Sequence, residues 1–209
     1  MVHTYANDAD ASDYIWVDGY SDEEAMEKLR RFRDNDPTLT HANISFSLSY
    51  LLNCHRHLTS ILKCNNTVIK LDLSNNYLDD KSAKAIASAM VGNCTLKEID
   101  LGENKIGDEG LHSIMKSMQD NRTLTKLVLS CNNFGDEGIR AVANLLYPLE
   151  KKMLKHILCE VLTNEAVEII SNELTMNTTL KYLDISCNNV SDDGAKLLAE
   201  ALGKNASLE

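Results

Sequence analysis

The chain has 209 residues, is 44% hydrophobic and carries a formal net charge of −10. It is therefore long enough for one sizeable domain with a packed core. The acidic surface would repel phosphate backbones, which argues against a nucleic-acid ligand. No run approaches the roughly 18 apolar residues of a membrane-spanning helix, which argues against a membrane partner.

The N-terminal residues have no apolar signal-peptide core. We therefore expect a cytoplasmic protein whose six cysteines are reduced. Residues 1–20 are acidic and lack a hydrophobic period, which predicts a mobile arm.

A capping helix is expected over residues 21–37. The stretch Ser21-Asp22-Glu23-Glu24 has the form of a capping box. An apolar stripe with helical spacing follows, made of Ala25, Met26, Leu29 and Phe32. We expect this helix to cover the open edge of the first strand, which would otherwise recruit another chain.

The next segment, EKLRRFRDNDPTLTHANIS, spans residues 27–45. It resembles the start of the repeat domain of tropomodulins and leiomodins, in which a helix ending in Asn-Asp-Pro also leads to Leu and then to Asn-Ile. The resemblance implies an actin-filament or cytoskeletal role. The chain shows neither the tropomyosin-binding half nor the C-terminal helix of that family, which argues against filament-end capping. The resemblance identifies no individual actin-binding residue in this chain.

The pattern L-x-x-L-x-L-x-x-N-x-L recurs within residues 38–209. Clear copies start near 68, 96, 124 and 180, a distorted copy starts near 154, and residues 38–67 form a degenerate first repeat. The 28-residue period and the long second half of each unit resemble the ribonuclease-inhibitor-like subclass of leucine-rich repeat proteins. Such a period predicts stacked units that share one core.

Each unit has a short alternating stretch followed by helical spacing, which predicts one strand and one helix. Strands stack about 4.8 Å apart, whereas helices need roughly 8–10 Å. The stack must therefore curve. We expect an α/β right-handed leucine-rich-repeat solenoid, a horseshoe with a concave parallel sheet and convex helices.

Polar and small residues recur at fixed places in the unit. A buried ladder of amides that satisfy backbone groups is expected from Asn76, Asn104, Asn132 and Asn188. Capping of free N–H groups is expected at the predicted helix N-termini, where Asp108, Asp136 and Asp192 lie. Close approach of helix and strand is expected at the small residues Gly110, Gly138 and Gly194.

An Asn-x-Thr/Ser glycosylation pattern closes nearly every unit, at Asn65, Asn93, Asn121, Asn177 and Asn205. Because it always precedes the next repeat, we interpret it as a by-product of the closing turn. Short polar side chains there can bond local backbone groups.

The sequence gives little indication of a catalytic or metal-binding site. G-x-S-x-G, P-loop and dinucleotide patterns do not occur in the sequence. Cys54 and His57, with Cys64 nearby, resemble metal ligands, but they lack the paired C-x-x-C spacing of structural zinc sites. Acid pairs such as Asp79-Asp80 are explained by helix capping. We therefore expect no enzyme activity, no cofactor and no metal.

The residues between the buried leucines of each strand are expected to point into the concave face. The predicted protein-binding residues are Lys70, Asp72, Glu98, Asp100, Lys126, Val128, His156, Leu158, Tyr182 and Asp184. Val128 and Leu158 make an apolar centre within a charged rim, which is typical of a protein-binding hot spot. The alternative is that these two side chains merely tolerate exposure.

The sequence thus predicts a non-enzymatic scaffold that binds a protein on its concave face, with actin as the partner that the resemblance implies. The alternative is a RanGAP-like activator of a small GTPase, since that family uses similar repeats. Inhibition of a basic enzyme, as by ribonuclease inhibitor, is a third interpretation. A new strand would begin at Leu208-Glu209, so we expect either a longer parent chain or self-association through this open edge.

Overall fold

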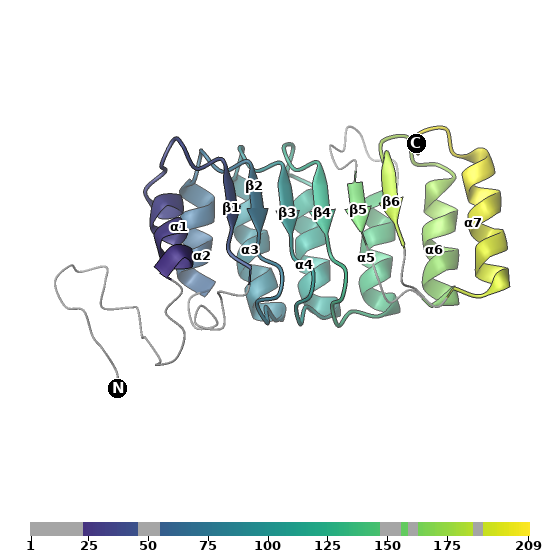
Figure 1. Cartoon of the computed structure of the whole chain (residues 1–209). Coiled ribbons are helices and arrows are strands. Elements are labelled where there is room, and N and C mark those ends of the chain that lie inside the picture. Colours follow the sequence, from purple (N-terminus) through teal and green to yellow (C-terminus); the bar gives the residue numbers. More distant parts are fainter. Residues whose placement is uncertain (1–22, 46–54, 147–155, 159–162, 186–189) are drawn as a thin grey trace.

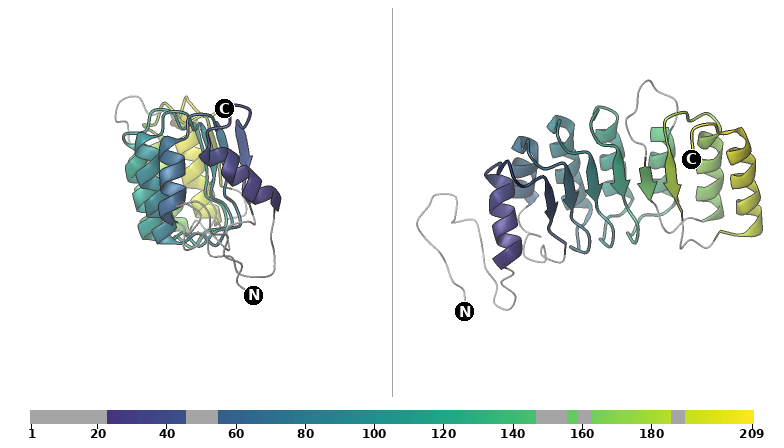
Figure 2. Two further views of the ribbon diagram at one scale, coloured as in Figure 1. Left: turned by 90° about the vertical axis from the view of Figure 1, so that its left-hand side faces the viewer. Right: turned by 45° about the horizontal axis from the view of Figure 1, so that its top comes forward.

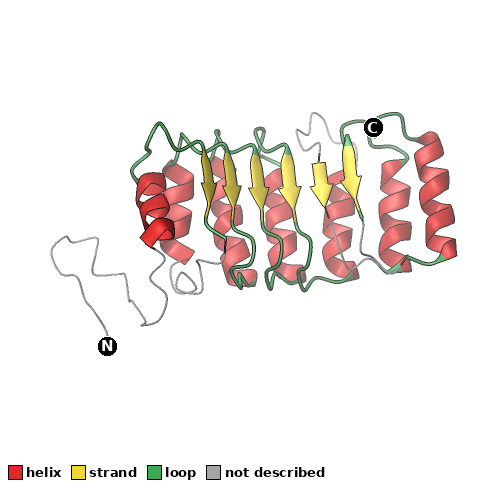
Figure 3. Ribbon diagram, in the orientation of Figure 1, coloured by secondary structure: helices red, strands yellow, loops and turns green. Residues whose placement is uncertain are grey.

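The structure is a computed structural model of the whole chain and describes residues 23–45, 55–146, 156–158, 163–185 and 190–209. These residues form two layers, one of strands and one of helices (Figure 1, Figure 3). Viewed from the N-terminal end, the helices of the repeats lie on one side of the sheet, whereas the first helix lies across the end of the stack (Figure 2).

Strands and helices alternate along the repeats. The strands are β1 (His41–Asn43), β2 (Lys70–Asp72), β3 (Glu98–Asp100), β4 (Lys126–Val128), β5 (His156–Leu158) and β6 (Tyr182–Asp184). The helices are α1 (Glu23–Arg33), α2 (His55–Cys64), α3 (Asp80–Gly92), α4 (Asp108–Met118), α5 (Asp136–Leu146), α6 (Asn164–Leu174) and α7 (Asp192–Lys204). The strands pair in parallel and in chain order, which confirms the predicted solenoid.

The core lies between the two layers and repeats with the sequence period. The middle residues of β2, β3 and β4 are buried, and these are Leu71, Ile99 and Leu127. One helix position is equally buried in four successive repeats, at Ile86, Ile114, Val142 and Ile170. Burial of each such side chain contributes roughly 1.5–3 kcal/mol. The repeats therefore share one continuous core, since none of them could bury its own apolar face.

Helix α1 lies at the N-terminal end of the stack and contacts both β1 and α2 (Figure 1). Leu29 and Phe32 of its predicted apolar stripe are buried. The packing therefore agrees with a helix that covers the first strand. Ser21 and the predicted arm over residues 1–20 lie outside the described residues.

The Asn-Asp-Pro turn after α1 is held by its own side chains. Asp36 accepts hydrogen bonds from the Thr38 hydroxyl (2.7 Å) and from Arg31 Nε (2.6 Å). These bonds lower the pKa of Asp36 to about 2. Asn35, at a positive φ of 53°, donates from Nδ2 to the Cys64 carbonyl, and its Oδ1 accepts the N–H of Asn66. The turn thus ties the end of α1 to the end of α2.

A row of buried asparagines closes the loops that follow the strands. Asn104 Oδ1 accepts from the backbone N–H groups of Asn76 and Leu78 in the preceding repeat. Its Nδ2 donates to the carbonyls of Leu73, Leu101 and Gly102. Asn132 repeats this arrangement one period later, with Ile106 N–H as a donor and Leu101 and Leu129 carbonyls as acceptors. Asn188 lies outside the described residues.

A second row of asparagines closes the other end of each repeat. The Nδ2 groups of Asn65, Asn93, Asn121, Asn177 and Asn205 donate to the carbonyls of Phe32, Leu62, Met90, Leu146 and Leu174, respectively. Each Oδ1 also accepts backbone N–H groups two and three residues later, as at Asn93 with Thr95 and Leu96. The first four asparagines are at most 7% exposed. In the folded chain the side-chain amides of these four residues are buried structural groups with no room for a glycan.

One of the predicted capping aspartates, Asp108, acts on a different helix from the one expected. Asp108 begins α4, but its Oδ1 accepts from the N–H groups of Gly135 and Gly138 at the start of α5. The start of α4 is held in the same way by Asp80, which accepts from Gly107 and Gly110. The N-cap residue of α4, Gly107, has no side chain to contribute. Capping therefore crosses from each of these repeats to the next.

The small residues at these helix starts leave room for the neighbouring repeat. A Cβ atom at Gly110 would lie 2.5 Å from Asp80 Oδ1 and 2.9 Å from Ala83 Cβ, both on α3. We predicted close approach of helix and strand at Gly110. The approach instead joins adjacent helices and includes the capping carboxylate.

The last residues lie beside β6. The Glu209 N–H donates to the Lys181 carbonyl, and the two side chains form an ion pair at 2.9 Å. The same backbone contact joins earlier strand starts, for example Lys97 N–H to the Ile69 carbonyl. Self-association through this edge stays a prediction.

Replacing Asn104 by Ala is expected to lower the free energy of unfolding by about 1–3 kcal/mol, because buried backbone groups in two repeats lose their partner. Equilibrium denaturation in urea measures this change. Asn133→Ala is the control, because Asn133 is exposed and joins neither row of asparagines; its effect should stay within about 0.5 kcal/mol. Equal effects of the two substitutions would contradict a structural role for the ladder.

Replacing Asp108 by Ala is expected to cost about 0.5–2 kcal/mol, the usual effect of removing a helix cap. The loss should appear as faster amide hydrogen exchange at the start of α5 rather than of α4. Exposed Asp120, replaced by Ala, controls for the change in charge. Faster exchange confined to the start of α4 would show that Asp108 caps its own helix.

Candidate functional site

The strand register places the predicted binding residues in two straight rows across the sheet. One row runs through His41, Lys70, Glu98, Lys126, His156 and Tyr182. The other runs through Asn43, Asp72, Asp100, Val128, Leu158 and Asp184. The ten predicted residues thus belong to one surface, the side of the sheet that the helices leave open. We call it the concave face.

The rows differ in exposure along the sheet. Lys70 and Tyr182 are exposed, and Tyr182 keeps 46% of its surface. Glu98, Lys126, Asp72, Asp100 and Asp184 are half-buried. Val128, expected to be an exposed anchor, is only 9% exposed. The side chains of His156 and Leu158 lie outside the described residues, so the apolar centre around them stays a prediction.

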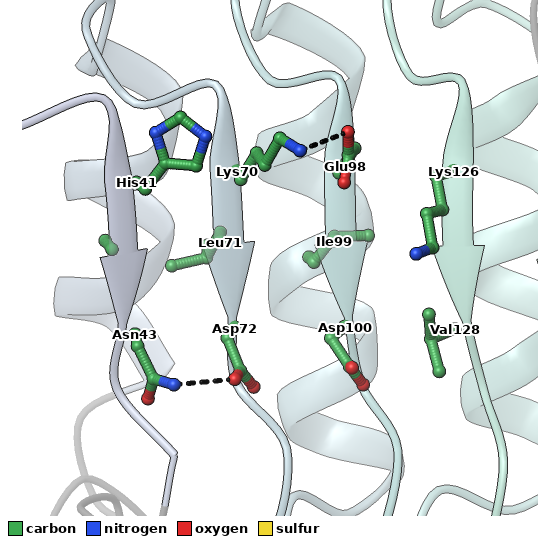
Figure 4. A pocket seen from close by; sticks show the side chains of 11 residues that line it. His41, Asn43, Lys70, Leu71, Asp72, Glu98, Ile99, Asp100, Lys126 and Val128 are labelled. Atoms are coloured by element: carbon green, nitrogen blue, oxygen red, sulfur yellow. Dashed lines mark hydrogen bonds and ion pairs between the residues drawn. The ribbon is translucent and has the colours of Figure 1, made fainter.

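A hollow of about 270 Å³ lies on the N-terminal half of this face, between β1 and β4 (Figure 4). The outward side chains that line it are His41, Asn43, Lys70, Asp72, Glu98, Asp100, Lys126 and Val128. His41 and Asn43 are not predicted from the sequence, because the first repeat lacks the full motif. Buried Ala42 and Ile44 alternate with them, and this alternation was the signal that could have found them.

The row nearer the strand starts carries charges of both signs. Lys70 Nζ lies 2.9 Å from Glu98 Oε1 on the next strand (Figure 4). Lys126 reaches toward β3 from the other side of Glu98 (Figure 4). This row therefore offers a partner mixed charge rather than a field of one sign.

The row nearer the strand ends is acidic between Asn43 and Val128. Asp72 and Asp100 are register partners on adjacent strands. Asp72 Oδ2 accepts a hydrogen bond from Asn43 Nδ2 at 2.9 Å, and its Oδ1 accepts from the Ser74 hydroxyl at 2.7 Å. Asp100 Oδ1 accepts from the Gly102 N–H at 2.8 Å. Burial raises the pKa of Asp100 most, and the charges of Asp72 and Glu103 raise it further, against the opposing effects of Gly102 and Lys126.

The described residues show neither a metal site nor a membrane-spanning helix. Among them, no three His, Cys, Asp or Glu side chains gather in a way that could hold a metal ion. Cys54 and the side chain of His57 lie outside the described residues. No helix within the described ranges is both long and apolar enough to cross a membrane.

Replacing Asp100 by Asn is expected to stabilise the fold at pH 7. The raised pKa means that ionisation of Asp100 costs the folded state more than the unfolded state, and Asn removes that cost while it can still accept from Gly102. The difference should vanish as the pH falls below the ordinary pKa of aspartate, where the wild-type group is protonated in both states. Urea denaturation over a pH series measures it, with Asp120→Asn as the matched control.

The chain matches the TMOD/LMOD leucine-rich domain over residues 21–157 and a general leucine-rich repeat pattern over 177–199. Among solved structures it is similar to leiomodin-1 actin-binding site 2, with a TM-score of 0.55 and 24% identity over 90% of this chain and 91% of that one. It is also similar to the C-terminal domain of Caenorhabditis elegans tropomodulin, with a TM-score of 0.54 and 16% identity over 87% and 93%. A comparison with curated protein sequences gives no match.

The two structural similarities establish the fold alone. The domain match goes further, because it covers most of the chain and includes the Asn-Asp-Pro turn that carried the resemblance. It extends far beyond the short segment identified from sequence and does not favour the RanGAP-like alternative. The chain therefore belongs to the TMOD/LMOD leucine-rich domain family.

Proposed function

We propose that the chain is a non-enzymatic, actin-binding scaffold of the cytoskeleton that works in the cytoplasm. The observation that carries this proposal is its membership of the TMOD/LMOD leucine-rich domain family over residues 21–157. The similar leiomodin-1 structure is described as an actin-binding site, which supports the same partner.

The concave face is the proposed binding surface. It is the uncovered side of the sheet, and its side chains are ordered by the strand register. The hollow between β1 and β4 combines both charges with an apolar wall at Val128. Exposed Tyr182 extends the surface toward the C-terminal end. Tyrosine is among the residue types that most often carry the binding energy of protein interfaces.

Co-sedimentation with filamentous actin and fluorescence titration of monomeric actin test the partner. We expect saturable binding in at least one of the two assays, weakened by added salt because charged residues line the surface. The same protein should leave GTP hydrolysis by small GTPases unchanged. Absence of actin binding in both assays would reject the proposed partner, and a stimulated GTPase would replace it with the alternative.

The double variant Leu158→Asp/Tyr182→Ala is expected to abolish actin capture while the fold stays intact. It places a charge in the predicted apolar centre and removes the exposed aromatic ring. A matched control is Val91→Asp/Met176→Ala, which makes the same kinds of change at exposed apolar residues outside the strands. Circular dichroism checks the fold. If both double variants bound actin like the wild type, the interface would lie elsewhere.

A further inference from the structure

The hollow between β1 and β4 has one side chain whose surroundings differ from those of its row neighbours. This inference rests on the proposed function, because it concerns the same concave face. Asn43, Asp72 and Asp100 occupy equivalent positions on β1, β2 and β3. All three lie on the wall of the hollow (Figure 4).

The first two of these side chains receive a hydroxyl donor from their own loop. The Ser45 hydroxyl donates to Asn43 Oδ1, and the Ser74 hydroxyl donates to Asp72 Oδ1, both at 2.7 Å. The equivalent residue on the third strand is Gly102, which has only its N–H to offer Asp100. Of the two aspartates that line the hollow, Asp100 is therefore the one with more unused acceptor capacity.

Gly102 also lacks the side chain that the equivalent residues, Ser45 and Ser74, carry. A Cβ atom there would lie 3.1 Å from Asp100 Oδ1 and 3.3 Å from Ser130 Oγ. A side chain at this position would therefore crowd the Asp100 carboxylate. The glycine thus leaves Asp100 without the hydroxyl donor that Asn43 and Asp72 receive and without a side chain of its own loop against the carboxylate.

The charge around Asp100 is not balanced within the described residues. Its register partner Asp72 has the same sign, and like charges on adjacent strands repel. In the described part of the chain, no Lys or Arg nitrogen lies within ion-pair distance of Asp100, although Lys126 is near enough to favour its charged form. A cation supplied from outside would relieve this repulsion.

We infer that the hollow receives an arginine side chain from the protein partner, with its guanidinium on Asp100 and its aliphatic stem along Val128. Arginine fits better than lysine because its planar fork matches a carboxylate, and because it is more weakly hydrated and so enters a half-buried site more easily. Val128 on the next strand gives the stem an apolar wall. The partner segment therefore presents an arginine beside a small apolar surface.

The direct test uses a small probe instead of actin. The isotope-labelled full chain is titrated with the dipeptide acetyl-Leu-Arg-amide and followed by the amide resonances of residues 98–102 and 126–130. We expect saturable shifts in these two segments, which weaken as salt is added. The matched probe is acetyl-Leu-citrulline-amide, which has nearly the same shape but no charge, and it should cause little change. Equal shifts from both probes, or shifts confined to other segments, would overturn the inference.

Three variants locate the interaction. Asp100→Asn removes the charge, and Gly102→Ser keeps it but restores the hydroxyl donor and fills the space. Each should raise the dissociation constant of the arginine probe by about tenfold or more, the size expected for a lost charged hydrogen bond. Asp120→Asn, which makes the same charge change outside the concave face, should leave it within about twofold. Thermal melting confirms that each variant is folded, and unchanged binding by folded Asp100→Asn would overturn the inference.

Two further arms separate this inference from its alternatives. Calcium chloride alone should not shift the same resonances; shifts at submillimolar calcium would make the hollow a metal site and overturn the arginine assignment. The actin assays run on the same variants. If actin still binds Asp100→Asn with wild-type affinity, the inference fails and the proposed function stands. If the arginine probe binds and actin does not, the proposed partner fails and the subsite stands.

Discussion

The fold depends on hydrogen bonds that buried asparagine amides make across the boundaries between repeats. Each strand has only three residues, so the ladder of backbone bonds is short. Most of each repeat is loop or helix end, where backbone groups would otherwise be buried without partners. Asn104 satisfies groups from two repeats at once, and Asn93 does the same at the opposite end of the unit. Core burial supplies the driving force, but these amides fix how the units align.

Alignment is also what makes a binding surface out of unremarkable side chains. Because the loops hold every strand in the same register, the outward residues fall into rows. Each row contains the equivalent residue of successive repeats. A residue that differs from its equivalents in the other repeats then changes the surface at that point only. Gly102 in place of a serine changes the acceptor capacity of Asp100 and the space beside it without moving the strand. Binding properties of this face should therefore depend on the residues that differ between repeats.

The sequence predicted the architecture because Leu71, Ile99 and Leu127 mark a period that needs only local spacing to recognise. It did not predict that Asp108 caps α5, since that contact depends on how far one repeat is offset from the next. The two rows of the concave face could be predicted from the alternation within each strand. The hollow could not be predicted, because β1, which lines one side of it, belongs to a repeat without the full motif. Val128 was placed on the correct face, yet its neighbours cover most of it.

Helix α5 shows how little independence a single unit has. Its first turn is capped by Asp108 from the unit before, and its final carbonyl, at Leu146, accepts from Asn177 in the unit after. Removing part of a unit would leave the N–H groups at the start of α5 and the Leu146 carbonyl without partners. Duplicating or deleting a whole unit would give each of these groups an equivalent partner from the new neighbour. The gain or loss of a whole unit should therefore disturb these capping contacts least, and an array of different length can keep the same set of contacts.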